Sequence, residues 1–146
     1  MTTETTNIQS IEEYSLFALD RSTDGLDSLC ADSRRCGQAI NLNDTKVFSQ
    51  ISALAVNLHD FDIFQNDICS FFMLDTDVIY DHAGTLTAAQ QAFKAALEEM
   101  AGQIGAGKMS TLAKLLCDEL PDTLTRFKSL LPRVREYIQN EYLQTA

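Results

Sequence analysis

Two aspartates that follow an apolar run are the residues in this chain best suited to chemistry. Residues 71–78 have the sequence FFMLDTDV, which places Asp75 and Asp77 two positions apart, directly after four apolar side chains. A carboxylate at the end of a buried strand can act as a nucleophile, and a second carboxylate beside it can transfer protons. This chemistry requires residues 71–74 to form a β-strand.

The sequence of residues 71–78 resembles the first motif of haloacid-dehalogenase-type phosphotransferases. The resemblance implies a phosphohydrolase in which one of Asp75 and Asp77 attacks phosphorus, with a lysine and a second acidic pair on later strands. In this chain, however, residues 71–74 continue a helical apolar pattern, and the segments after them are helical in pattern as well. An Asp-dependent phosphohydrolase is therefore an alternative, and we expect a protein that is not an enzyme and has no catalytic residue.

The same aspartates, together with Asp81 and His82, do not match a known cation loop. Counted from Asp75, an EF-hand would need glycine at the sixth position and glutamate at the twelfth, where Tyr80 and Leu86 stand. We therefore expect no metal and no cofactor. The four cysteines contain no CxxC pair, which favours reduced, buried thiols.

Residues 46–74 are predicted to form one long helix around which the rest of the chain is organised. No glycine or proline occurs between Gly37 and Gly84. An apolar seam follows alternating steps of four and three, with one gap filled by Gln65. Its members are Val47, Ile51, Leu54, Leu58, Phe61, Ile68 and Phe72. At 1.5 Å per residue such a helix is roughly 40 Å long, which indicates an elongated bundle.

The helix before it is expected to run from Ile8 to Ile40, after a disordered tail at residues 1–7. Its predicted seam is rich in small residues, which let a neighbour approach closely but bury little apolar area. These small residues are Ser15, Ala18, Ser22, Gly25 and Ser33. Gly25 weakens the helix, so a break within residues 20–25 is an alternative. A short connector at residues 41–44 makes the first two helices antiparallel neighbours.

The remaining segments complete a single helical-bundle domain at residues 8–146. Thr87 and Gln90 fit a capping box for a third helix that begins at about Ala88. The last helical arm contains Pro121 and Pro132, each of which can end or kink a helix. The predicted fold is therefore all-α: an elongated up-down four-helix bundle with long antiparallel first two helices and a kinked C-terminal arm.

Residues 112–132, LAKLLCDELPDTLTRFKSLLP, resemble the end of an uncharacterised family of small bacterial helical proteins. The family has a LADLLEYEL-type helix that is followed by proline and an amphipathic helix. The resemblance rests on the leucines together with Glu119, Leu120 and Pro121, whereas Cys117 and Asp118 depart from the family pattern. It implies a helical bundle and no particular activity.

The charge of the chain is unevenly distributed. The formal net charge is −10, and all of it lies in the first 82 residues, because residues 83–146 contain seven acidic and seven basic side chains. This disfavours direct binding to nucleic acid or to an anionic membrane and is compatible with a basic partner. The N-terminus has no secretory pattern and no apolar run is long enough to span a bilayer, so a cytoplasmic protein is predicted.

The predicted long helix is apolar on more than its seam. Val56 and Ile63 stand opposite the seam, one heptad apart, and Phe64 and Phe71 lie on one flank. Asp60 and Asp67, also a heptad apart, would edge this surface. Either the helix is covered on several sides, or this part of it is exposed and meets a partner.

The leading hypothesis is a non-enzymatic protein–protein interaction module, such as an adaptor, an inhibitor or a secretion-type chaperone. The expected partner is a protein that is basic or presents an amphipathic helix, and pairing of two copies as a homodimer is also possible. The alternative is an acidic nucleic-acid mimic that blocks a basic groove on a partner.

Overall fold

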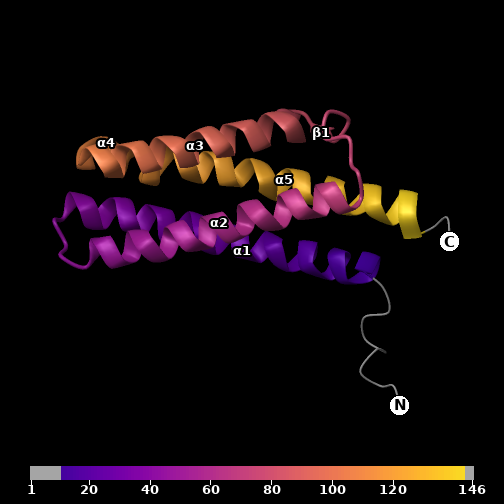
Figure 1. Cartoon of the computed structure of the whole chain (residues 1–146), viewed down its shortest axis with the longest axis horizontal. Coiled ribbons are helices and arrows are strands. Elements are labelled where there is room, and N and C mark those ends of the chain that lie inside the picture. The colour runs from indigo at the N-terminus through magenta and orange to yellow at the C-terminus, as the bar shows by residue number, and fades with distance from the viewer. Residues whose placement is uncertain (1–10, 144–146) are drawn as a thin grey trace, which may run out of the picture.

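The computed structural model describes residues 11–143, which form an elongated bundle of antiparallel helices (Figure 1). The first three helices are α1 (Ile11–Asn41), α2 (Val47–Phe71) and α3 (Leu86–Ala106). A long C-terminal helix follows and is made of α4 (Met109–Lys114), the π-helical turn η2 (Leu115–Glu119), α5 (Leu120–Ile138) and the π-helical turn η3 (Gln139–Leu143). The predicted all-α, up-down four-helix bundle with a kinked C-terminal arm is confirmed. The tail predicted at residues 1–7 lies outside the described residues.

Helix α1 is continuous through Gly25, so the alternative of a break within residues 20–25 is wrong. The predicted seam is only partly right in the N-terminal half of this helix, where Ser15 is buried but Gly25 is exposed. Leu16, Leu19 and Leu26 are the large residues buried there. Leucines bury far more apolar area than the small residues of the predicted seam, and they therefore decide which face of the helix turns inward.

Helix α2 buries the predicted seam from Val47 to Ile68, and Gln65 is buried in the expected gap. Gln65 Oε1 accepts a hydrogen bond of 2.7 Å from Gln90 Nε2 on α3, which satisfies the polar group that this position brings into the interface. The helix ends at Phe71, earlier than predicted. Met73 adopts a φ of 51°, a left-handed conformation that no longer continues the helix.

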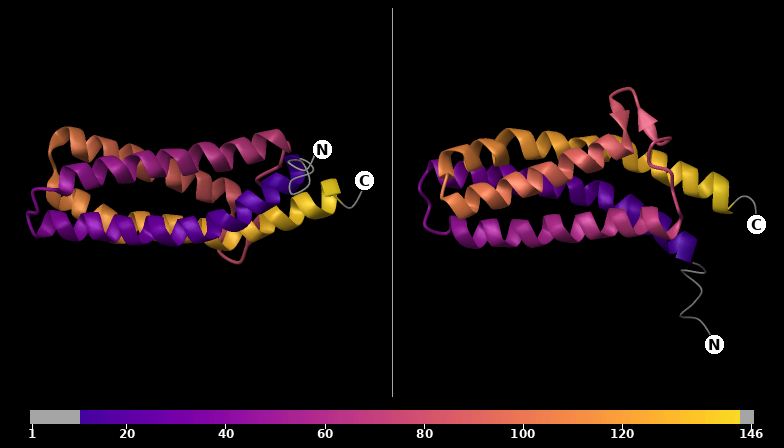
Figure 2. Two further views of the ribbon diagram at one scale, coloured as in Figure 1. Left: turned by 90° about the horizontal axis from the view of Figure 1, so that it is seen from below. Right: turned by 45° about the horizontal axis from the view of Figure 1, so that its top comes forward.

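Three phenylalanines form the centre of the core and join three helices. Phe61 of α2, Phe93 of α3 and Phe127 of α5 pack edge to face, with ring centroids 5.2–5.7 Å apart. This is the favoured geometry for aromatic pairs. Helix α1 covers the core by packing against the C-terminal helix and α2 (Figure 2).

Pro121 does not end the C-terminal helix but lies in the first turn of its segment α5, directly after the turn η2. In this turn the Leu120 N–H donates to the Leu115 carbonyl, so the hydrogen-bond register is shifted by one residue. The Leu116 carbonyl then faces Pro121, which has no N–H to donate. The Ser33 hydroxyl of α1 donates to this carbonyl at 2.6 Å and satisfies it.

A two-stranded antiparallel hairpin, β1 (Tyr80–Asp81) and β2 (Gly84–Thr85), connects α2 to α3. Thr85 is the N-cap of α3, and its hydroxyl accepts a hydrogen bond from the Ala88 N–H at 3.1 Å. The predicted cap at Thr87 is therefore wrong. The Thr87 hydroxyl instead donates to the Asp77 carboxylate at 2.6 Å and ties the loop to the start of α3.

Candidate functional site

The acidic pair Asp75 and Asp77 lies in the loop after α2 and closes that loop. Asp75 accepts a hydrogen bond of 3.0 Å from the Asp77 N–H, and Asp77 accepts one from Thr87. Phe71 ends α2 and residues 72–73 form a turn, so the strand that the phosphotransferase chemistry requires is not present at this motif. Within residues 11–143, no group of three or more His, Cys, Asp or Glu side chains is arranged to hold a metal ion.

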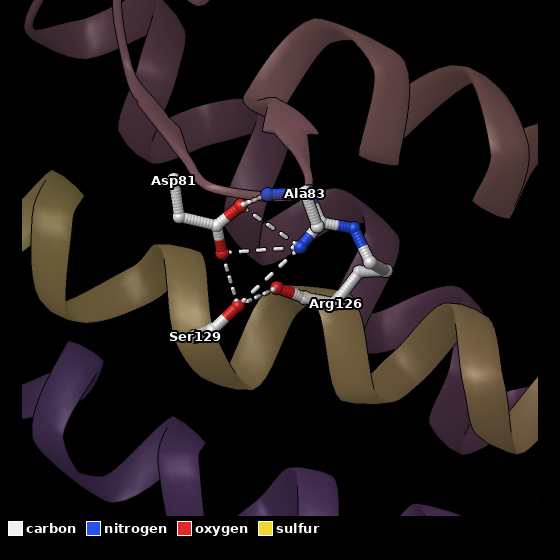
Figure 3. A network of polar contacts seen from close by, with 4 residues as sticks. All are labelled: Asp81, Ala83, Arg126 and Ser129. Carbon is white, nitrogen blue, oxygen red and sulfur yellow. Dashed lines mark hydrogen bonds and ion pairs between the residues drawn. The ribbon is translucent and has the colours of Figure 1, made fainter.

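Asp81 anchors the hairpin to α5 (Figure 3). Its carboxylate accepts hydrogen bonds from Ser129 Oγ at 2.6 Å, from Arg126 Nη1 at 3.1 Å and from the Ala83 N–H at 2.9 Å. The Asp81 side chain is only 6% exposed. The Ser129 hydroxyl and the Arg126 guanidinium together hold the pKa of Asp81 well below its usual range. The sequence reasoning considered Asp81 only as a cation ligand, and it missed Arg126 and Ser129, which lie three residues apart on one face of α5.

The predicted partner-binding residues lie together on the outer side of α2. We call this set the α2 surface: Val56, Asp60, Ile63, Phe64, Asp67 and Phe71. On a helix of 3.6 residues per turn, they fall within roughly 100° of arc, away from the buried seam. The exposed fractions are 59% for Val56, 45% for Ile63 and 57% for Phe71, and both aspartates are also exposed. Phe64 differs from the other apolar members, because it is half-buried against the core.

A further exposed apolar side chain of α2 lies apart from this surface. Phe48, in the first turn of α2, is 65% exposed. It follows the seam residue Val47 directly, which places it off the buried face. Its position directly after a seam residue would have predicted this exposure from the sequence, but Phe48 was not among the predicted residues.

The charge of α2 is one-sided. The helix contains Asp60, Asp62 and Asp67, and between Val47 and Phe71 it has no lysine or arginine. Within the described part of the chain, neither Asp60 nor Asp67 forms an ion pair. The α2 surface therefore combines exposed apolar side chains with two uncompensated carboxylates.

No family model matches this chain, and neither a curated protein nor a solved structure is detectably similar to it. Across residues 11–143, no helix has the length and apolar character needed to cross a membrane.

Proposed function

We propose that this protein is a non-enzymatic protein-binding module, such as an adaptor, an inhibitor or a secretion-type chaperone, that captures a basic amphipathic helix on the α2 surface. The observation that carries the proposal is the exposure of Val56, Ile63 and Phe71 on a helix whose opposite face is buried in the core. Large apolar side chains grouped on an exposed helix face are typical of a protein interface.

A helical partner fits this surface because its apolar face can lie along α2 in the way that amphipathic helices bind their targets. Basic side chains at the edges of such a helix would meet Asp60 and Asp67. A second copy of this chain fits less well, because two-fold pairing of the α2 surfaces would bring the same carboxylates together.

The test uses a fluorescein-labelled peptide of about 18 residues, or five helical turns, with leucines at helical spacing and lysines elsewhere. Ile63→Asp should weaken its binding at least tenfold in an anisotropy titration, because the new carboxylate would be buried among apolar groups. Val78→Asp is the matched control, since Val78 is 53% exposed in the loop and outside the α2 surface. It should bind as the unsubstituted protein does.

Two results would contradict the proposal: equal binding by Ile63→Asp and the unsubstituted protein, or equal binding of a peptide in which glutamate replaces every lysine. Ile63→Asp should leave the free energy of unfolding within about 0.5 kcal/mol, as expected of an exposed position. Global unfolding of this variant would show instead that Ile63 belongs to the core.

The acidic nucleic-acid mimic makes a different prediction. Its binding would fall steeply with salt and would depend on carboxylates rather than on Val56 and Ile63. The structure engages Asp75 and Asp77 in the loop, which leaves fewer free acidic groups for mimicry. Binding that is lost with salt but retained in Ile63→Asp would favour the mimic.

A further inference from the structure

An open hollow lies beside the α2 surface, between α1 and α2. Its volume is about 360 Å³, which is within the range of ~300–1,000 Å³ for pockets that hold ligands. Phe61 and Phe64 contribute aromatic side chains to its lining. Because Phe64 also belongs to the α2 surface, the hollow continues that surface toward α1.

A second, smaller hollow of about 200 Å³ follows on along the same pair of helices. Both hollows are lined by Asp32 and Asn57, so they succeed one another between α1 and α2. An elongated depression of this kind suits an extended occupant, such as the side chains along one face of a helix, better than a compact ligand.

Gly25 lines the larger hollow and has no role in packing within the fold. A Cβ atom placed on it would meet nothing within 4 Å, and its φ does not require glycine. Glycine in a helix interior destabilises the helix relative to alanine, so this position lowers stability with no compensating contact among the described residues. Its effect on the structure is to keep the hollow open.

The carboxylates of the hollow indicate the charge of the occupant. Asp32 and Asp60 both contribute to the lining of the larger hollow, which includes no basic residue, whereas Arg35 lines the smaller one. Asp32 already forms an ion pair of 2.6 Å with Arg35 on its own helix. Asp60 therefore remains available to a cation from outside.

We propose that the hollow at Gly25 receives an apolar anchor side chain of the basic amphipathic helix, and that a lysine or arginine one turn away on that helix pairs with Asp60. This inference rests on the proposed function and specifies what the partner must present. A second copy of this chain lacks that match, because it would bring another acidic α2 rather than a cation.

The test is Gly25→Leu, which places an apolar side chain in the lining of the hollow, at a position where an added Cβ meets nothing within 4 Å. Leucine also has the higher helix propensity, so the variant should be at least as stable as the unsubstituted protein. Its affinity for the leucine–lysine peptide should fall at least tenfold. Gly102→Leu on α3 is the matched control, because Gly102 is also open to solvent within a helix but lines neither hollow. That variant should keep full affinity.

The outcomes separate this inference from the function on which it rests. Equal binding by Gly25→Leu and Gly102→Leu, with binding still lost in Ile63→Asp, would overturn the anchor hollow and leave the proposed function intact. Full binding in all three variants would overturn both. A concentration-dependent doubling of mass in sedimentation that Gly25→Leu abolishes would also overturn the inference, because the occupant would then be a second copy.

Discussion

Two glycines of the same helix have opposite surroundings. At Gly37, α1 touches the C-terminal helix so closely that an added Cβ would overlap Cys117 Sγ and lie 2.9 Å from the Ala113 carbonyl oxygen. At Gly25, an added Cβ would meet no other atom within 4 Å. Close packing against the C-terminal helix explains why glycine stands at position 37, whereas no contact explains glycine at position 25. The difference distinguishes a side of α1 that is closed by packing from a side that is left open.

The closed side is also the side on which polar groups find partners. Ser33 satisfies the carbonyl that Pro121 leaves without a donor, and Asp27 of α1 forms an ion pair of 2.8 Å with Lys128 of α5. On the open side, Asp60 and the exposed apolar residues of α2 have no comparable partners among residues 11–143. This contrast is what the proposed binding function explains.

The largest expected effect comes from the same substitution at the two glycines. Gly37→Leu should lower the free energy of unfolding by about 3 kcal/mol or more, because backbone atoms of the C-terminal helix must move. Gly25→Leu should not lower it at all. Urea unfolding of both variants measures the difference, and equal destabilisation would show that the two sides of α1 are packed alike.

A smaller effect is expected where a hydrogen bond is removed on the closed side. Ser33→Ala leaves the buried Leu116 carbonyl without a donor, so we expect a loss of about 1–3 kcal/mol in unfolding free energy. Ser28→Ala is the control, since Ser28 lies in α1 but is exposed, and it should change stability by less than about 0.5 kcal/mol. An unchanged stability of Ser33→Ala would show that the Leu116 carbonyl does not need the Ser33 hydroxyl as a donor.

The smallest effect concerns pH and the attachment of the hairpin. The lowered pKa of Asp81 means that the folded state favours its ionised form. Its contribution is therefore complete above the ordinary aspartate pKa of about 3.9 and is lost as pH falls below that value. Asp81→Asn should make stability less dependent on pH between about 5 and 2. Identical slopes in the variant and the unsubstituted protein would contradict this role.

The sequence patterns predicted the fold correctly where the inward face of a helix is uniformly apolar. The seam of α2 is regular and strongly apolar, so its burial and the bundle architecture followed from spacing alone. In α1, leucines and small residues compete for the inward face, and the prediction placed Gly25 on the wrong side. The turn η2 was not predicted, because the carbonyl that it leaves beside Pro121 is satisfied by Ser33 of another helix, a contact that local spacing does not reveal.

For the α2 surface, the sequence predicted which residues share a side of the helix, but it did not predict their surroundings. The spacing placed Val56 and Ile63 opposite the seam and Phe71 on its flank, but it left open whether this side of the helix is covered. In the structure all three side chains are exposed. Phe64 is half-buried because it packs against the core, and the hollow at Gly25 depends on the separation of two helices. Neither property can be obtained from the periodicity of one helix.

The most direct test of the central claim is a residue-by-residue map of peptide binding. The full chain, labelled with ¹⁵N, is titrated with the leucine–lysine peptide, and backbone amide shifts are followed by NMR. We expect the largest shifts along the α2 surface and around Gly25, with little change at Leu124 and Phe127 in the buried face of α5. Shifts confined to the hairpin or to α5, or no shifts at any peptide concentration, would contradict the claim.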